Sequence, residues 1–118
     1  MCNSDNTINC NKLRVKFNFT INKSIIRICL TLYYNGNEIG TLCFDCHIYD
    51  IRILILPFEN SGLVTSYSPT NNNVLTFNEL TFTIRHFSLR RISNNEYMLD
   101  YTIAINSTEC IGSERQTF

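Results

Sequence analysis

Two runs of alternating apolar and polar residues, joined by a short turn sequence, constrain this chain more than any other feature. The first run is Ile25 to Tyr34, the second is Thr41 to Tyr49, and Asn35-Gly36-Asn37 lies between them. Alternation with a period of two is typical of a strand that has one face on a core, and Asn-Gly pairs favour tight hairpin turns. The pattern therefore predicts a β-hairpin at the centre of the fold.

The register of this hairpin follows from the requirement that core-facing residues lie opposite one another. A two-residue turn at Asn35-Gly36 would set the apolar positions of one strand against the polar positions of the other. A three-residue loop, Asn35-Gly36-Asn37, keeps the apolar faces together, and we therefore predict that loop. The resulting pairs are Leu30 with Leu42, Ile28 with Phe44 and Ile26 with Cys46 on the core face, and Arg27 with Asp45 and Cys29 with Cys43 on the other.

The remaining chain carries further strand patterns and no helical periodicity. Residues Leu13 to Ile21 and Leu63 to Tyr67 read as strands, and the apolar run Ile51 to Leu56 is predicted to be a strand buried on both faces. Val74 to Ile92 reads as one or two strands, and the apolar phase slips at Arg85-His86. A β-bulge at that point would keep both halves on the core.

A last hairpin pairs Phe87 to Arg91 with Tyr97 to Ile105, which sets Leu89 against Leu99. About seven to eight short strands predict an all-β fold, a two-layer antiparallel β-sandwich. The pattern does not separate immunoglobulin-like, C2-like and jelly-roll topologies. We expect one sandwich domain over residues 1–118, with a loose lead at 1–11 and a loose tail at 110–118.

Six cysteines, an even number, permit disulfides in an oxidising compartment. A core of this length does not require them, and the first eleven residues have neither the basic nor the apolar segment of a signal peptide. We therefore expect reduced thiols and a cytoplasmic protein. The alternative is a secreted protein whose signal peptide was removed. In the hairpin register, Cys29 and Cys43 are close enough to form a redox-labile pair.

The chain holds 10 basic and 10 acidic residues, so no overall field favours nucleic acid. The longest apolar runs fall far short of the roughly 18 residues that cross a bilayer, so no membrane span is expected. One local basic cluster, Arg85, His86, Arg90 and Arg91, is a candidate site for an acidic protein partner. The alternative interpretation is a solvated strand face whose charges protect an edge.

Cys43-Phe44-Asp45-Cys46-His47 matches the C-x-x-C-H pattern of covalent haem attachment. A strand places Cys43 and Cys46 on opposite faces, which disfavours haem. Zinc bound by Cys43, Cys46 and two of Cys2, Cys10, Cys110 or His47 would need convergent thiolates, and the sequence has no second closely spaced pair. The acidic residues lack the D-x-D spacing of a calcium site. We expect no cofactor and no metal.

Motifs that carry enzyme chemistry are absent: there is no Gly-rich phosphate loop, G-x-S-x-G elbow or H-E-x-x-H. The sequence therefore predicts a non-enzymatic protein-binding module that uses an exposed sheet face or an edge strand. One alternative is a secreted, disulfide-linked sandwich that holds a lipid or other apolar ligand between its sheets. The other is a metal or redox protein built on Cys43 and Cys46. The identity of the partner and the oligomeric state are left open.

Overall fold

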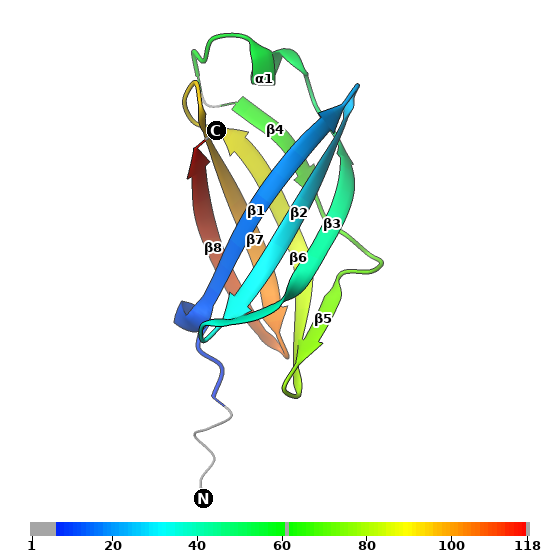
Figure 1. The fold of residues 1–118 in the computed structure, drawn as a ribbon, viewed down its shortest axis with the longest axis vertical. Helices are drawn as coiled ribbons and strands as arrows, with labels where there is room; N and C mark the ends of the chain where they lie inside the picture. The colour runs from blue at the N-terminus through cyan, green and yellow to red at the C-terminus, as the bar shows by residue number, and fades with distance from the viewer. Residues whose placement is uncertain (1–6, 61, 118) are drawn as a thin grey trace, which may run out of the picture.

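The computed structural model describes residues 7–60 and 62–117, which form two packed antiparallel sheets (Figure 1). The first sheet has the order β1 (Leu13–Asn22), β2 (Ile25–Tyr34) and β3 (Asn37–His47). The second has the order β4 (Gly62–Tyr67), β6 (Leu80–Arg91), β7 (Glu96–Ile105) and β8 (Thr108–Thr117), and β5 (Val74–Phe77) also pairs with β6. The predicted all-β, two-layer antiparallel sandwich is confirmed.

The core lies between the sheets and is built from alternate residues of the strands. Ile28, Leu30, Phe82 and Leu99 are among the side chains with no exposed surface. Aromatic rings from the two sheets meet there: the ring centroids of Phe44 and Phe87 are 5.6 Å apart, a distance typical of favourable aromatic pairs. The space between the sheets is therefore filled by side chains in contact.

The central hairpin has the predicted register over its core, although its turn differs from the prediction. Leu30 pairs with Leu42, Ile28 with Phe44, Ile26 with Cys46, Arg27 with Asp45 and Cys29 with Cys43. The turn has two residues and not three, because Tyr34 pairs with Asn37. Asn35 and Gly36 both have positive φ (53° and 83°), as a type I′ turn requires. A bulge at Ile39, which is skipped between the Tyr33–Glu38 and Leu32–Gly40 pairs, restores the apolar faces.

The second predicted hairpin and its bulge are confirmed. Leu89 pairs with Leu99 and Arg91 with Tyr97, as the apolar pattern required. The register then shifts between Ile84 and His86, which leaves Arg85 as the extra residue of a bulge. The segment from Val74 to Ile92 forms two strands, β5 and β6.

The prediction of a buried strand over Ile51 to Leu56 is wrong. Residues Arg52–Ile55 form the short helix α1, and Ile51, Ile55 and Leu56 are exposed. The chain leaves the first sheet here: Tyr49 N donates to Val64 O at 3.0 Å, and the Asp50 side chain accepts from Arg52 N at 3.0 Å. An apolar run of six residues suits a short helix that crosses between sheets as well as it suits a strand, so periodicity alone gave the wrong element.

The prediction of loose ends at 1–11 and 110–118 is also wrong for the residues that the structure describes. The tail forms β8, which pairs with β7 along its whole length. Near the N-terminus, the 3-10 turn η2 (Cys10–Lys12) precedes β1, and Cys10 is disulfide-bonded to Cys110 with a Cα–Cα distance of 5.4 Å. Residues 1–6 of the lead, including Cys2, and Phe118 of the tail lie outside the described residues.

The two sheets contact each other on both sides of the sandwich, through β4 and β5 against β3 on one side and through β1 and η2 against β8 on the other. Thr65 Oγ1 donates to His47 O at 2.7 Å, and Leu75 packs against Gly40, so β4 and β5 cover the edge of β3. On the opposite side β1 and β8 run along the open edges (Figure 1), and Cys10–Cys110 links them at one end. In the described part of the chain, no helix is long and apolar enough to cross a membrane.

Candidate functional site

The predicted basic cluster does not form one surface. Arg85 is exposed at the bulge of β6, whereas Arg90 and Arg91 are neighbours on a strand and point to opposite faces. Arg91 faces inward and is only 5% exposed. The four residues Arg85, His86, Arg90 and Arg91 therefore have different surroundings.

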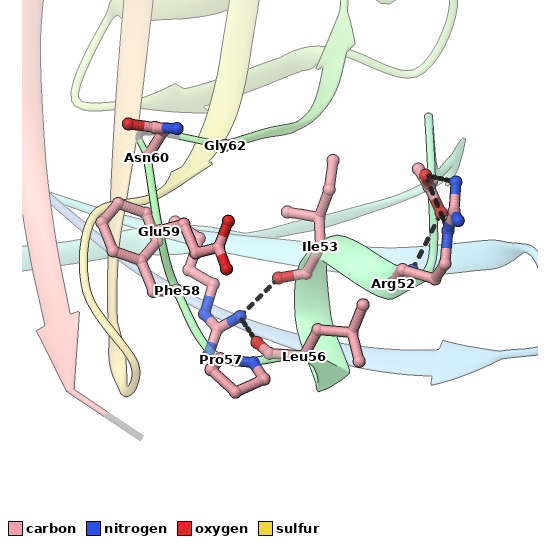
Figure 2. A pocket seen from close by; sticks show the side chains of 10 residues that line it. Arg52, Ile53, Leu56, Pro57, Phe58, Glu59, Asn60 and Gly62 are labelled. Atoms are coloured by element: carbon pink, nitrogen blue, oxygen red, sulfur yellow. Dashed lines mark hydrogen bonds and ion pairs between the residues drawn. The ribbon is translucent and has the colours of Figure 1, made fainter.

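Arg91 holds the α1 segment against the end of the sandwich. Its Nη1 donates to Ile53 O at 2.7 Å and to Leu56 O (Figure 2 draws these two bonds). Its Nε and Nη2 donate to the Ser93 and Asn94 carbonyls at 3.1 and 2.8 Å. A buried guanidinium is costly unless its donors are satisfied, and four backbone carbonyls accept from four of its five N–H groups. Arg91 therefore stabilises the fold, and its side chain is too buried to contact a partner.

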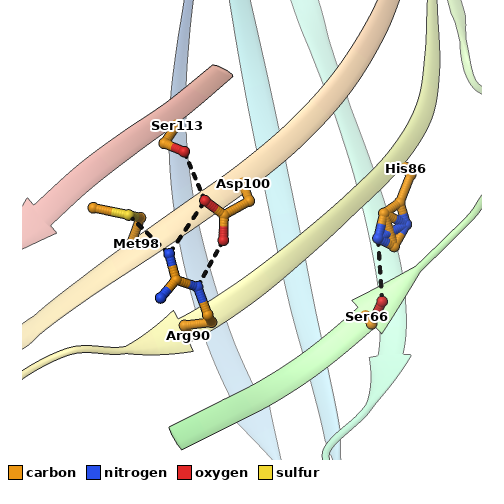
Figure 3. A network of polar contacts seen from close by, with 6 residues as sticks. All are labelled: Ser66, His86, Arg90, Met98, Asp100 and Ser113. Atoms are coloured by element: carbon orange, nitrogen blue, oxygen red, sulfur yellow. Dashed lines mark hydrogen bonds and ion pairs between the residues drawn. The ribbon is translucent and has the colours of Figure 1, made fainter. Parts of the chain in front are cut away.

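Arg90 lies on the outer face of the five-stranded sheet, in a polar group with Asp100 and Ser113 (Figure 3). Arg90 Nε donates to Asp100 Oδ2 at 2.7 Å, Arg90 Nη2 lies 3.1 Å from Met98 Sδ, and Ser113 Oγ donates to Asp100 Oδ1 at 2.6 Å. Hydrogen bonding from Arg90 lowers the pKa of the Asp100 carboxyl. The charge of Arg90 is therefore largely neutralised on this face.

His86 lies between two hydroxyl groups on the same face. Its Nε2 and Nδ1 are each 3.3 Å from a serine Oγ, Ser66 and Ser68 respectively (Figure 3 draws the first). No carboxylate in the described ranges is within hydrogen-bond distance of His86, so the ring lacks the orienting acid of a catalytic triad. The arrangement suits hydrogen bonding and gives no support to acid–base chemistry.

The Cys29–Cys43 pair is a disulfide on the outer face of the three-stranded sheet, with Cα atoms 4.0 Å apart. The expectation of reduced thiols therefore fails for Cys10, Cys29, Cys43 and Cys110, which are bonded in two pairs. The pairing of β2 with β3 places Cys29 directly opposite Cys43, as the predicted register required.

The two cysteines of the C-x-x-C-H sequence lie on different faces. Cys43 is exposed and disulfide-bonded, whereas Cys46 is a free thiol buried against the core. Burial raises the pKa of the Cys46 thiol to about 11, so the thiol stays protonated and unreactive at neutral pH. Within residues 7–60 and 62–117, no group of three or more acidic, His or Cys side chains could hold a metal ion.

Two hollows flank α1 at one end of the molecule. The larger, about 450 Å³, is lined by Ile53, Leu56, Phe58 and Glu59 among others, and the smaller, about 370 Å³, by Tyr49 and Ile51 among others. Both are open to solvent. Arg52, the other cation of the larger hollow, is paired with Asp50 at 2.8 Å. The surface around α1 is mainly apolar, and its two cations, Arg52 and Arg91, are already bonded to other groups of the same chain.

The edge of β8 was missed by sequence reasoning. Ile105 and Thr108 close a two-residue hairpin, so Thr108, Cys110 and the following even-numbered residues direct their backbone groups to β7. The odd-numbered residues from 109 to 115 direct theirs outward. Cys10 Sγ lies 3.7 Å from Glu109 O, in agreement with this, although a disulfide sulfur has no hydrogen to donate.

The middle of this edge is unprotected. Ile111 is 80% exposed, the largest exposed fraction among the exposed large apolar side chains of the described chain. By contrast, the other open edge, β1, carries Arg14 and Lys16 on its exposed face, and Arg14 Nη1 donates to the Leu13 carbonyl of the edge itself at 3.0 Å. Charged side chains of this kind discourage strand addition. In the sequence, the turn-forming residues Asn106-Ser107 were the signal for β8, and that signal is weak.

Comparisons with protein-family models, with curated proteins and with solved structures found no match. The function is therefore argued from the residues and their geometry.

We expect Arg91→Met to lower the free energy of unfolding by about 2 to 4 kcal/mol, because four backbone carbonyls lose a charged donor. Residues 50–60 should then become sensitive to proteases in the folded protein, since α1 loses its attachment. Chemical denaturation and limited proteolysis measure the two effects. Arg90→Met is the matched control: its partly exposed ion pair should contribute about 1 kcal/mol or less. Equal losses from the two variants would show that Arg91 does not hold the segment.

A mild thiol reductant should open Cys29–Cys43 before Cys10–Cys110, because Cys43 is exposed whereas Cys110 is 2% exposed. Timed quenching with an alkylating agent, followed by peptide mapping by mass spectrometry, gives the order. Cys46 should stay unlabelled until the protein is unfolded. Earlier opening of Cys10–Cys110, or labelling of Cys46 in the folded protein, would contradict this assignment.

Proposed function

We propose that this domain is a non-enzymatic protein-binding module that binds an extended segment of a partner along the edge of β8. The observation that carries the proposal is the open, ten-residue edge strand with Ile111 exposed at its centre. An edge strand presents unpaired N–H and C=O groups in a row, and an added strand satisfies them. Main-chain hydrogen bonds would supply the affinity, and side chains beside Ile111 the selectivity.

The outer face beside this edge supports the same function. Ser113 donates a hydrogen bond to Asp100, and Asp100 accepts from Arg90. These three polar side chains, on β8 and the two strands behind it, therefore have fixed positions. A preorganised edge loses little conformational entropy when a partner binds. Among the residues of the predicted basic cluster, Arg85 is left exposed beside His86 and could add a contact to an acidic partner.

The two disulfides favour the secreted alternative over the cytoplasmic one, because reducing compartments keep thiols free. The alternative of an apolar ligand between the sheets has no comparable support, since rings such as Phe44 and Phe87 occupy that space. A metal or redox site built on Cys43 and Cys46 is disfavoured by their opposite orientations.

Ser113→Pro should abolish partner capture without unfolding the protein. Proline removes the outward N–H of residue 113 and is tolerated on edge strands. Ser113→Ala is the matched control, because it loses the same hydroxyl and keeps the N–H. Pull-down from an extract of the native host should recover the same proteins with the parent and Ser113→Ala, and lose them with Ser113→Pro. Unchanged capture by Ser113→Pro, with the fold checked by thermal unfolding, would contradict the proposal.

A further inference from the structure

The sequence of β8 is complementary to itself in an antiparallel arrangement. Glu109 and Arg115 lie three residues on either side of Gly112, and both are exposed; Arg115 Nη1 is 3.8 Å from Glu96 Oε2 of the same chain. When two copies of β8 run antiparallel about Gly112, Glu109 of each copy lies opposite Arg115 of the other. Opposite charges directly across a strand pair are favourable.

The backbone permits this register. Residues 109, 111, 113 and 115 direct their N–H and C=O groups to the free edge, and the arrangement pairs these residues only with one another: 109 with 115, and 111 with 113. A shift of one residue would set outward groups against groups already bonded to β7. A shift of two keeps the hydrogen bonds but removes Glu109 from Arg115. Charge thus selects one of the allowed registers.

The same register covers the exposed Ile111. It lies opposite Ser113 of the second copy, and the two Ile111 side chains become diagonal neighbours across the two-fold axis. Gly112, at the axis, presents no side chain, and a Cβ there would lie 2.6 Å from the Tyr101 ring carbon Cζ. The Tyr101 side chain therefore lies over Gly112 on that face of the sheet.

The rest of the fold would close this assembly after two copies. The Cys10–Cys110 disulfide lies beside the Glu109 carbonyl, so the main-chain hydrogen bonds of the pairing are those of residues 111 and 113, and Glu109 and Arg115 meet through their side chains. On its other side, the five-stranded sheet meets β3 through β4 and β5. A two-fold pairing of one edge with itself is closed by symmetry and does not propagate.

We propose that the segment taken by the β8 edge is β8 of a second copy, in a two-fold dimer with Glu109 opposite Arg115. This inference rests on the proposed function, because it names the partner of the same edge. The dimer would join two five-stranded sheets into one continuous sheet with Ile111 at its centre.

Charge reversal tests both the dimer and its register. Sedimentation over a range of concentrations should show a monomer–dimer equilibrium for the parent. Glu109→Arg alone, or Arg115→Glu alone, places like charges opposite one another at two symmetric positions and should weaken the dimer about ten-fold at low salt. The double variant E109R/R115E restores opposite charges and should return the affinity to within a few-fold of the parent. Lys16→Glu, a reversal on the β1 edge, should have no effect.

A double variant as weak as the single variants, or a parent that stays monomeric at every concentration, would overturn the inference. If the parent is monomeric while Ser113→Pro still loses captured proteins, self-pairing fails and the proposed function stands. A dimer that persists unchanged in Ser113→Pro would overturn the inference, because the two copies would then associate through another surface.

Discussion

The alternation of side chains along each strand is the constraint on which this structure depends. Each sheet has one face on a shared core, so every strand must keep its apolar residues on that side. Bulges at Ile39 in β3, Val64 in β4 and Arg85 in β6 each absorb one extra residue in the described strands. Without these bulges, the residues beyond them would turn their apolar face to solvent.

The same constraint explains how the edges differ. One side of the sandwich is closed where β4 and β5 meet β3, and α1 is held over one end by Arg91. The other side is linked by Cys10–Cys110, whose sequence separation of 100 residues gives it a stabilising effect of up to about 5 kcal/mol in the chain-entropy account. The edge strand β1 carries the charged side chains of Arg14 and Lys16, which discourage the addition of another strand. β8 is left as the edge open to another strand.

Sequence reasoning predicted both hairpins because parity is encoded in neighbouring residues: Ile28 against Phe44 and Leu89 against Leu99 need no long-range information. The prediction from sequence failed where the local pattern of residues did not distinguish one element from another. The apolar run at α1 fits two kinds of element, and the tail has little apolar character beyond Cys110 and Ile111, so nothing marked it as a strand. The Ile39 bulge was not predicted, because a three-residue loop gives the same core pairs as a two-residue turn followed by a bulge.

The candidate site was harder to predict than the fold, for a physical reason. The basic cluster was grouped by closeness in sequence, yet neighbours on a strand face opposite ways, and Arg91 is used by backbone carbonyls 35 to 38 residues away. An edge is likewise a property of the whole topology, because β8 is free only if no later strand pairs with it. Neither feature can be read from a short stretch of residues.

Amide hydrogen exchange along β8, measured residue by residue in dilute and in concentrated protein, tests the central claim most directly. The even-numbered amides from 110 to 116 should be protected at both concentrations, because they bond to β7. The amides of Ile111 and Ser113 should exchange rapidly in dilute protein and slowly in concentrated protein, as the edge becomes paired. Fast exchange of these two amides at every concentration would contradict the assignment of β8 as the self-pairing edge.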